Sequence, residues 1–576
     1  MTTVVGIGYP YHDCGAAVLV DGEIVAAVNE SRLSRIKREA RFPSSAVNEL
    51  LEDVESVDRI ALAGVENAPL GRTLRTELKR TDNSVDRLAE GLRAVQSGLA
   101  KTPAIVRETA EKLAAETSLS GAVQELVENI EYVDHHRAHA ASAYYTSGFA
   151  DATVLTIDSS GDGLSSAVWT GSDGTLEQVA TNDSVDSIGR IWNQVPTVFG
   201  FKGFRHAGKF MGLASYCDDV PPGLGATFDE LLTVDGLSVK NRFRRAHAND
   251  SYEERVLAWK DLVGDYSAPA VASALQRRTE EVVTEFAETA VETTGCANLA
   301  LAGGVTANVK LNQRLYELDR VDRLFVHQNM GDGGLAVGAA LDHWARSESP
   351  VDPTLLDDVY LGPSYDEASI QRAIEAAELP EGYRVRRFDS DDELAAFAAG
   401  LLADGHVVNL FRGRMEYGPR ALGNRSILYQ PTDPSAITWL NERLERTAFM
   451  PFAPVTLAEE ADECYENYDP DACPAAMFMT ITFDCTETMQ KRSPGAVHLD
   501  GTARPQILEE RMNPFYYAVV DEYRRQTGVP TLLNTSFNVH GEPIVCTPGD
   551  ALRSFLDFGT KALVIGTTAV VAPEES

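Results

Sequence analysis

The chain has 576 residues, of which 51 are Lys or Arg and 86 are Asp or Glu, so its formal net charge is −35. This balance argues against nonspecific binding to nucleic acid or to anionic membranes, and the length predicts two or more domains. Lysine is scarce, at 11 residues against 40 Arg, and together with the acidic excess this is typical of a halophilic protein.

The seven cysteines are scattered along the chain without a CxxC pair, which indicates reduced and mostly buried thiols. No apolar run approaches the roughly 20 residues that a membrane-spanning helix requires. The N-terminus passes directly into an apolar strand, without the basic and apolar regions of a signal peptide. We therefore expect a cytoplasmic protein with no membrane partner.

Two stretches of the chain repeat one pattern, in which three apolar strands are separated by short polar turns. The first covers residues 4–28 and the second begins at residue 152. In each, an Asp-Gly pair, Asp21-Gly22 or Asp173-Gly174, joins two apolar runs and predicts a β-hairpin. Two such meanders, each followed by helices, indicate the duplicated α/β fold of actin-like ATPases and sugar kinases, by analogy of fold alone. Between them, residues from about 68 to 130 predict a helical insertion.

The pentad that runs from His135 to His139 suggests a metal site. Helical spacing places these two imidazoles one turn apart on one face. Asp158 follows at the end of an apolar strand, and Asp332 stands in a glycine-rich loop. Two imidazoles and two carboxylates form a mixed set that leaves coordination positions open, which suits Fe(II), Zn or Mn. A His pair at this spacing is by itself more often surface or core, and the two carboxylates favour the metal hypothesis.

A glycine turn follows another apolar strand, at Gly303 and Gly304, and a helix begins near Asn308. Such a turn allows backbone N–H groups to approach a phosphate at a helix N-terminus, so these residues are candidates for nucleotide binding; a plain tight turn is the alternative. Because lysine is scarce, we also interpret three lysines as candidate anion contacts, with surface charge as the alternative: Lys37, Lys202 and Lys209.

A compositional break at residues 346–353 predicts a domain boundary, with a first domain over 1–346 and a second over 356–576. The second domain alternates helical stretches with apolar strands. Its residues 411–426 contain four arginines and one acid, Glu416. Guanidinium groups bind phosphate or carboxylate through bidentate hydrogen bonds, although such arginines can also pair with surface carboxylates. Asn534 and Ser536, after a later strand, are a plausible second wall of the same pocket.

At this point the chain resembles the O-carbamoyltransferase family that includes the tobramycin, cephamycin and nodulation-factor carbamoyltransferases. The N-terminal part is similar to the tRNA threonylcarbamoyl transferase and the C-terminal part to the synthase of threonylcarbamoyl-adenylate. The likeness covers nearly the whole chain and is carried by separated motifs: Tyr11-His12-Asp13, the pentad with Ala140-Ala141, Met211-Gly212-Leu213-Ala214, Ala302-Gly303-Gly304-Val305, residues 416–427, Pro451-Phe452-Ala453-Pro454 and Asn534-Thr535-Ser536-Phe537-Asn538.

The resemblance implies a two-stage reaction. The C-terminal domain would form carbamoyl-adenylate from carbamoyl phosphate and ATP, assisted by Mg²⁺, and the N-terminal domain would transfer the carbamoyl group to a hydroxyl of a small molecule. It implies an iron site of the His-x-x-x-His plus two Asp type, His12 as general base, and Lys37 as an electrostatic stabiliser. The residues expected to hold the anions are Arg420, Arg425, Arg446, Arg504, Asn534 and Ser536.

Three alternatives remain open on the sequence. A tRNA threonylcarbamoyl transferase-like enzyme is disfavoured because the chain has no basic face. A non-catalytic nucleotide-binding module would keep the fold without turnover, and a kinase would release ADP where the adenylating enzyme releases AMP. The acceptor and the oligomeric state are not readable from the residues.

Overall fold

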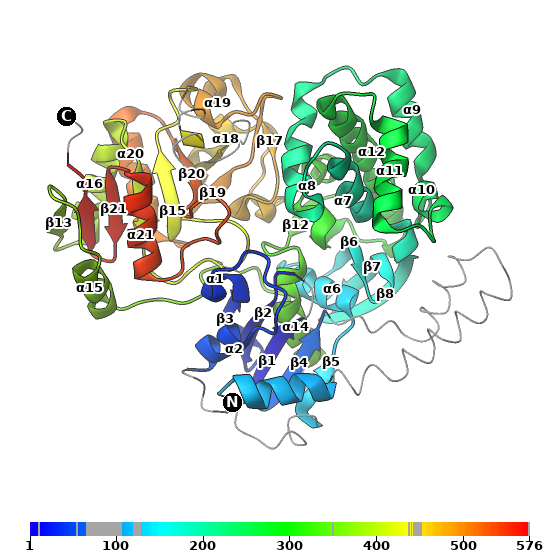
Figure 1. Ribbon diagram of the computed structural model, residues 1–576, viewed down its shortest axis with the longest axis horizontal. Helices are drawn as coiled ribbons and strands as arrows, with labels where there is room; N and C mark the ends of the chain where they lie inside the picture. Colours follow the sequence, from blue (N-terminus) through cyan, green and yellow to red (C-terminus); the bar gives the residue numbers. More distant parts are fainter. Residues whose placement is uncertain are drawn as a thin grey trace. The chain divides into compact units, whose positions relative to one another are not determined.

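The computed structural model describes residues 1–9, 12–52, 54, 56–64, 106–118, 128–347, 351–356, 358–435, 438, 440–441 and 452–573. The chain forms two compact units (Figure 1). The first comprises Met1–Ala27 and Ala40–Leu355, and the second comprises Val28–Glu39 and Leu356–Ser576. Val28–Glu39, which the sequence analysis placed in the first domain, thus belongs to the second unit. Most of the predicted helical insertion lies outside the described residues; within it, residues 106–116 are helical.

The first unit begins with a five-stranded sheet of order β3-β2-β1-β4-β5. Strand β1 pairs antiparallel with β2 and parallel with β4, and β4 pairs parallel with β5. The predicted hairpin is present, because Asp21 and Gly22 both have positive φ, at 51° and 89°. The strands are β1 (Thr3–Gly8), β2 (Gly15–Val20), β3 (Glu23–Asn29), β4 (Arg59–Ala63) and β5 (Ile130–Tyr132). Helix α2 (Ser44–Leu51) lies between β3 and β4 in the chain, and α6 (His135–Tyr145) follows β5.

A second five-stranded sheet has the order β12-β11-β6-β7-β8. Its central strand β6 again pairs antiparallel with the next strand of its meander and parallel with the strand that follows the helices. The two sheets therefore share one strand order and one pattern of direction. The strands are β6 (Ala152–Gly161), β7 (Leu164–Ser172), β8 (Thr175–Asp183), β11 (Asn298–Ala302) and β12 (Arg323–Val326).

Helices follow the second meander along the chain; two of them contact its central strand, and the last of them packs against the first sheet. The longest, α12, spans 27 residues and ends at Gly295, whose φ of 75° is the left-handed conformation that terminates helices. The set consists of α7 (Ile188–Val198), α8 (Gly203–Gly212), α9 (Pro222–Leu231), α10 (Arg242–Ala246), α11 (Tyr252–Val263), α12 (Ala268–Thr294), α13 (Val309–Tyr316) and α14 (Leu335–Ser347), with the hairpin β9 (Leu232–Asp235) and β10 (Ser238–Asn241).

The second unit is built on an eight-stranded mixed sheet of order β13-β22-β21-β14-β15-β20-β16-β19. The strands are β13 (Arg384–Arg387), β14 (Val408–Phe411), β15 (Arg425–Tyr429), β16 (Ala453–Leu457), β19 (Gln506–Leu508), β20 (Thr531–Ser536), β21 (Ala562–Ile565) and β22 (Thr568–Val571), and a separate pair is β17 (Phe483–Asp484) with β18 (Thr502–Ala503). The helices are α1 (Glu30–Ser34), α15 (Glu367–Ala376), α16 (Asp391–Ala403), α18 (Ala461–Cys464), α19 (Glu487–Arg492), α20 (Pro514–Thr527) and α21 (Pro548–Phe558).

The chain is thus a mixed α/β protein. Within the described ranges, no helix has both the length and the apolar composition needed to cross a membrane.

Candidate functional site: a buried histidine–aspartate cluster and an arginine loop

Helix α6 carries the two histidines of the predicted metal site. Asp134 caps the helix, and its carboxylate accepts hydrogen bonds from the backbone N–H groups of His136 and Arg137. The cap fixes where the first turn begins, and therefore which residues face the site. Helix α14 packs against α6 so closely that a Cβ on Gly338 would overlap the carbonyl oxygen of Ala138. The position of the first turn of α6 therefore depends on the Asp134 cap and on the close contact with α14 that the absence of a side chain at Gly338 allows.

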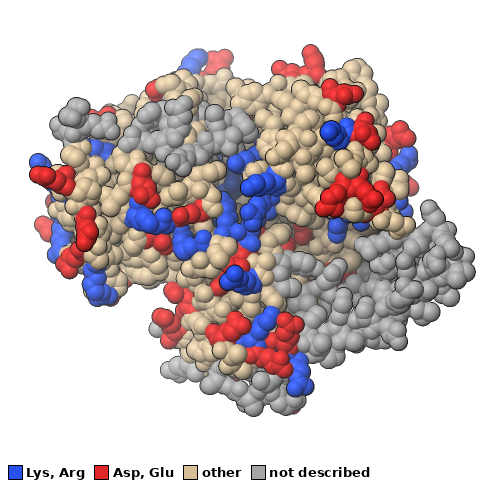
Figure 2. Space-filling model, viewed as in Figure 1, with Lys and Arg blue, Asp and Glu red and all other residues tan. Residues whose placement is uncertain are grey.

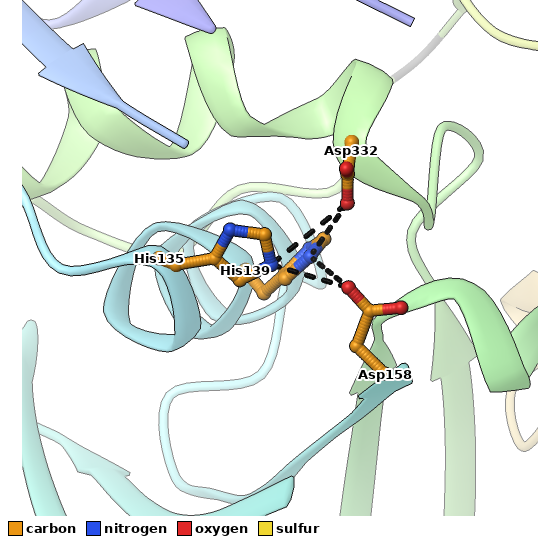
Figure 3. A group of neighbouring side chains, drawn as sticks. All are labelled: His135, His139, Asp158 and Asp332. Atoms are coloured by element: carbon orange, nitrogen blue, oxygen red, sulfur yellow. Dashed lines mark hydrogen bonds and ion pairs between the residues drawn. The ribbon is translucent and has the colours of Figure 1, made fainter. Parts of the chain in front are cut away.

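Four predicted ligands converge, as Figure 3 shows. His135 Nε2 lies 3.1 Å from Asp158 Oδ2 and 3.8 Å from Asp332 Oδ1. His139 Nε2 lies 3.6 Å from the same oxygen of Asp158 and 3.7 Å from that of Asp332. The four ligand atoms lie within 4.8 Å of one another. The aspartates come from strand β6 and from the 3₁₀ turn Asp332–Gly334, so three separate elements build the cluster.

The surroundings of these side chains fit a divalent cation. Both histidines are fully buried, and Asp158 and Asp332 are each 8 % exposed. Neither ring nitrogen of His139 makes a hydrogen bond, although a buried imidazole normally has a partner. A metal ion satisfies one such nitrogen, and two carboxylates offset its charge. The donor set suits Fe(II), Zn or Mn and does not choose among them.

Ionisation within the cluster is strongly perturbed. Burial opposes the charged form of His135, but the hydrogen bond to Asp158 and the charge of Asp332 raise the pKa of His135 to about 9. Burial likewise opposes ionisation of Asp158, but the neighbouring histidines hold the pKa of this carboxyl well below its usual range. The cluster therefore retains anionic character that can receive a cation.

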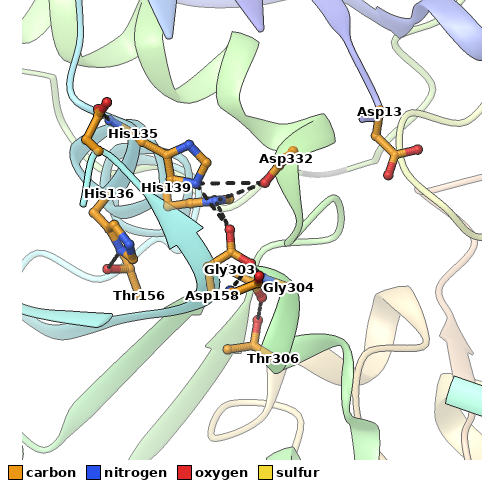
Figure 4. Close-up of polar contacts among 12 residues, drawn as sticks. Asp13, His135, His136, His139, Thr156, Asp158, Gly303, Gly304, Thr306 and Asp332 are labelled. Atoms are coloured by element: carbon orange, nitrogen blue, oxygen red, sulfur yellow. Dashed lines mark hydrogen bonds and ion pairs between the residues drawn. The ribbon is translucent and has the colours of Figure 1, made fainter. Parts of the chain in front are cut away.

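Supporting contacts surround the four residues, and sequence reasoning missed most of them. Asp162 is fully buried and accepts hydrogen bonds from Tyr132 Oη at 2.6 Å and from the backbone N–H of His135 at 2.7 Å. Burial raises the pKa of Asp162 to about 6. His136 turns away from the cluster, and its Nδ1 lies 2.8 Å from Thr156 Oγ1 (Figure 4). His136 is therefore not a ligand, although it sits between two of them in the sequence.

The glycine turn supports the cluster directly. Gly303 has a φ of 101°, and a Cβ there would overlap the backbone of Ile157. The backbone N–H of Gly304 donates to Asp158 Oδ1 at 3.3 Å. In the structure this turn thus orients a ligand carboxylate. Asn308 caps helix α13 and pairs with the amide of Gln276, so its side chain is engaged within the fold and its predicted role in nucleotide binding is not supported.

The remaining predicted residues of the first domain have different positions. His12 Nδ1 lies 3.0 Å from Asp13 Oδ2 and 3.8 Å from Asp332 Oδ2, beside the cluster. Its side chain is 40 % exposed, so it is accessible to a substrate. Lys209 lies on helix α8 and is partly buried. Lys37 is exposed in a turn after α1 and belongs to the second unit, and its role stays a prediction.

In the second unit, the predicted anion pocket is a tightly fixed loop between β14 and β15. Glu416, which sequence analysis treated only as a counter-charge, is 3 % exposed, and its Oε1 accepts backbone N–H bonds from Leu422, Asn424 and Arg425 at 2.8–3.0 Å. One carboxylate oxygen therefore organises the end of the loop. The signal available in the sequence was that Glu416 is the one acid among four arginines, just ahead of a glycine-containing run.

The arginines of this loop divide into two kinds. Arg425 is fully buried, stacks on Phe411 at 3.8 Å, and donates to backbone carbonyls that include Arg412 O at 2.6 Å and Gly413 O at 3.2 Å. Arg414 likewise donates to Leu361 O at 2.6 Å. We therefore assign Arg425 to the support of the loop, and its contact with an anion stays a prediction.

Arg420 differs from these residues. Among the described residues it makes no hydrogen bond or ion pair, and burial lowers its pKa to about 10, at which the guanidinium is still charged at neutral pH. A partly buried cation without a carboxylate partner is a favourable site for an anionic ligand. Arg420 is thus the predicted anion contact that the geometry favours most.

The second wall of the pocket lies on neighbouring strands. Asn534 Nδ2 donates to Ala421 O and to Gln506 Oε1, both at 3.1 Å, while its Oδ1 is buried without a hydrogen bond. Ser536 ends strand β20 and pairs in register with Ser426. Arg504 is partly buried between β18 and β19. Arg446 lies outside the described residues.

Two family models match this chain. A family model described as Carbamoyltransferase N-terminus matches residues 3–341, and one described as Carbamoyltransferase C-terminus matches residues 399–572. Nodulation protein NolNO of Sinorhizobium fredii is 33 % identical over 96 % of this chain and 78 % of its own length. Nodulation protein NolO of Bradyrhizobium diazoefficiens is 34 % identical over 75 % of this chain and 78 % of its own. The chain therefore belongs to the carbamoyltransferase family and is a transferase enzyme.

An uncharacterized protein of Synechocystis is also similar, at 32 % identity over 96 % of this chain and 94 % of its own. Solved structures align less well. Component A of the (R)-2-hydroxyglutaryl-CoA dehydratase of Acidaminococcus fermentans covers 59 % of this chain and is itself covered to 97 %, with 13 % identity and a TM-score of 0.32. The Sua5 protein of P. abyssi covers 31 % and is covered to 47 %, with 13 % identity and a TM-score of 0.23. Scores this low carry no conclusion about function.

Proposed function

We propose that the protein is an ATP-dependent O-carbamoyltransferase that forms carbamoyl-adenylate from carbamoyl phosphate and ATP and delivers the carbamoyl group to a hydroxyl of a small molecule. The observation that carries the proposal is the buried cluster of His135, His139, Asp158 and Asp332, which lies within the residues matched by the carbamoyltransferase N-terminal model. Arg420, which has no partner in the part of the chain that the structure describes and lies within the C-terminal match, supports the activation half of the reaction.

The activation half balances as follows. Hydrolysis of carbamoyl phosphate releases phosphate and carbamate, and a carbamate oxygen attacks the α-phosphorus of ATP while pyrophosphate leaves. Arg420 offers a guanidinium fork to the phosphate oxygens, and Asn534 and Ser536 offer amide and hydroxyl groups on the neighbouring strand. Mg²⁺ would accompany the ATP phosphates. Arg446 and Arg504 stay candidates for the same anions.

The transfer half uses residues beside the histidine–aspartate cluster. His135, His139, Asp158 and Asp332 would hold a divalent ion, which would supply Lewis-acid chemistry toward the carbamoyl group. His12, oriented by the Asp13 carboxylate at 3.0 Å, accepts the proton of the acceptor hydroxyl as that oxygen bonds to the carbamoyl carbon and AMP leaves. Gly304 and Lys209 are proposed to contact the phosphate of the adenylate.

We also infer that the first unit has the duplicated actin-like fold. The support is internal, because its two sheets share one strand order and one pattern of parallel and antiparallel pairs. In that fold class a nucleotide binds between the two halves, which is consistent with an adenylate as the carbamoyl donor.

Pyrophosphate exchange tests the activation half. The wild-type protein with ATP and labelled pyrophosphate is expected to exchange label only when carbamoyl phosphate is present. Arg420→Ala should abolish exchange, because the variant removes the unpaired guanidinium of the pocket. Arg412→Ala is the matched control, since its guanidinium is already paired with Asp391 at 2.9 Å. Release of ADP in place of AMP and pyrophosphate would identify a kinase, and normal exchange by Arg420→Ala would refute the pocket assignment.

Metal analysis tests the transfer half. His139→Gln is expected to reduce bound metal, measured by mass spectrometry of the digested protein, and to stop carbamoyl transfer while exchange of pyrophosphate continues. His136→Gln controls for a changed buried histidine on the same helix, because His136 contacts Thr156. Unchanged metal content in His139→Gln would contradict the ligand set. Incubation with ATP, carbamoyl phosphate and cell extract should then show an acceptor heavier by one carbamoyl group, and a modified tRNA would instead favour the tRNA alternative.

A further inference from the structure

A short segment from the beginning of the chain is part of the second unit. Val28–Glu39 follows strand β3 of the first sheet and contains helix α1. Arg32 on this helix donates from Nη2 to the carbonyl oxygen of Gly418 at 2.7 Å. Gly418 lies two residues before Arg420, so this segment contacts the arginine loop close in sequence to Arg420.

The same helix also contacts the loop on the other side of Arg420. Leu33 packs against an apolar cluster formed by Met415, Ala421, Ile544 and Cys546, all buried. Ala421 directly follows Arg420 in the chain. The segment therefore touches the loop both before and after the arginine that the proposed function places against the substrate anions.

Helix α1 is itself held firmly in place. Arg35, in the left-handed conformation with a φ of 59°, ends the helix and donates to Ile544 O at 2.6 Å and to Pro543 O at 2.9 Å. Its guanidinium also lies 3.5 Å from Asp550 and 3.7 Å from Glu542. These contacts hold helix α1 in place, and Arg32 on this helix can therefore restrain the loop through its hydrogen bond to Gly418.

The contact of Arg32 falls on a glycine of the loop that has a positive φ. The carboxylate of Glu416 fixes the backbone N–H of Leu422, and Asn534 holds the carbonyl of Ala421. Gly418 has a φ of 122°, where only glycine is unstrained, so the peptide groups around it rotate at little cost unless they are bound. The hydrogen bond from Arg32 supplies that restraint, and a charged donor makes it stronger than a neutral one.

We propose that Arg32 is a positioning residue for Arg420. The loop that carries Arg420 would then be held in place by Val28–Glu39, a segment from near the beginning of the chain. The inference rests on the proposed function, because it takes Arg420 as the contact for carbamoyl phosphate and ATP. Arg32 touches no substrate in this proposal. It holds the loop in the conformation from which Arg420 reaches the anion.

The test uses the full chain and pyrophosphate exchange as a function of carbamoyl phosphate concentration. Arg32→Ala is expected to lower kcat/KM about tenfold, the loss that one charge-assisted hydrogen bond of ordinary strength supports, mainly through a raised KM. Guanidinium ion added at low concentration should restore part of the activity, and Arg32→Lys should lie between. Arg38→Ala, which removes the same charge from the same segment and for which the described residues show no partner, is expected to stay within about twofold of wild type.

Two further measurements separate the outcomes. Metal content and thermal unfolding show whether Arg32→Ala is folded, and Arg32→Lys replaces it in the comparison if it is not. Calorimetric binding of pyrophosphate is measured in all variants without turnover, and Arg32→Ala should bind more weakly than Arg38→Ala. Equal binding and exchange by these two variants would overturn the positioning role. Absence of carbamoyl-phosphate-dependent exchange in the wild type would overturn the proposed function, while weaker pyrophosphate binding by Arg32→Ala would still support the contact.

Discussion

His327 couples the stability of the first unit to pH. This imidazole is fully buried, and burial, with the nearby charge of His139, lowers its pKa to about 3 from an ordinary value of 6.5. Between these two values the unfolded chain binds a proton that the folded chain does not. The stability that His327 contributes is therefore complete above pH 6.5 and is lost as the pH falls toward 3.

We expect the free energy of unfolding to decrease by up to about 1.4 kcal/mol for each pH unit below 6.5 through this group alone. His327→Gln should show a shallower decrease between pH 6.5 and 4.5 in urea unfolding followed by circular dichroism, even if it is less stable at neutral pH. His406→Gln, which changes a partly exposed histidine of the second unit, serves as the control. Equal slopes for the wild type and His327→Gln would show that another group sets the acid sensitivity.

Arg420 and Arg425 show what residue type alone cannot decide. Both stand in one glycine-rich run, and both were predicted to bind anions. Arg425 begins strand β15, so its side chain enters the core and its donors are used by loop carbonyls. Arg420 lies in the loop itself, and its buried Nε has no hydrogen-bond partner among the described residues. A guanidinium becomes a binding group only where the fold leaves it without a partner.

Helix α6 and helix α14 illustrate how packing sets the metal cluster. Gly338→Ala would push the new Cβ into the carbonyl of Ala138 and displace the first turns of α6. We expect this variant to lose at least about 1–3 kcal/mol of stability and to bind metal more weakly, as measured by competition with a chelator. Gly400→Ala, inside helix α16 with open space around it, should instead be neutral or stabilising by up to about 1 kcal/mol. Wild-type metal affinity in Gly338→Ala would show that the helix contact does not position the ligands.

The loop between β14 and β15 depends on Glu416 in the same way. Glu416→Ala leaves three buried N–H groups without an acceptor and should lower the free energy of unfolding by about 3 kcal/mol or more, with loss of pyrophosphate exchange. Glu416→Gln keeps a carbonyl acceptor and should be affected less. Denaturant unfolding of the two variants, combined with the exchange assay, measures both effects. Similar stability of Glu416→Ala and wild type would mean that the loop is fixed by other contacts.

Over the whole molecule, acidic residues outnumber basic ones by 86 to 51. Asp and Glu side chains are spread over the face shown in Figure 2 and do not gather in one patch. Such a distribution repels itself at low ionic strength, and salt screens the repulsion over about 10 Å at 0.1 M. We expect the Tm to rise by several degrees between about 0.1 and about 2 M KCl, measured by calorimetry, with NaCl acting alike. A Tm or an activity that falls over this range would refute the proposed adaptation to high salt.

Much of the local structure was predictable, because short-range backbone geometry fixes it. Asp-Gly pairs adopt the left-handed conformations of tight hairpins, as found at Asp21-Gly22 and Asp173-Gly174, and strands β1–β3 and β6–β8 follow the predicted apolar runs. The helical spacing of His135 and His139 likewise fixed their common face, and Asp158 and Asp332 joined them. The partners of Asn308 could not be predicted, because its side chain caps helix α13 and pairs with Gln276, which lies 32 residues earlier in the chain.

The sequence by itself thus determined the mixed α/β class, the two meanders and the identity of the four converging side chains, since each of these follows from local periodicity or from a recognisable set of donor atoms. Only the tertiary structure decided that residues 28–39 belong to the second unit and that Arg425 supports a loop which presents Arg420. The physical reason is that hydrogen-bond partners and burial are set by residues hundreds of positions away, as for Arg32 and Gly418, and no local pattern specifies them.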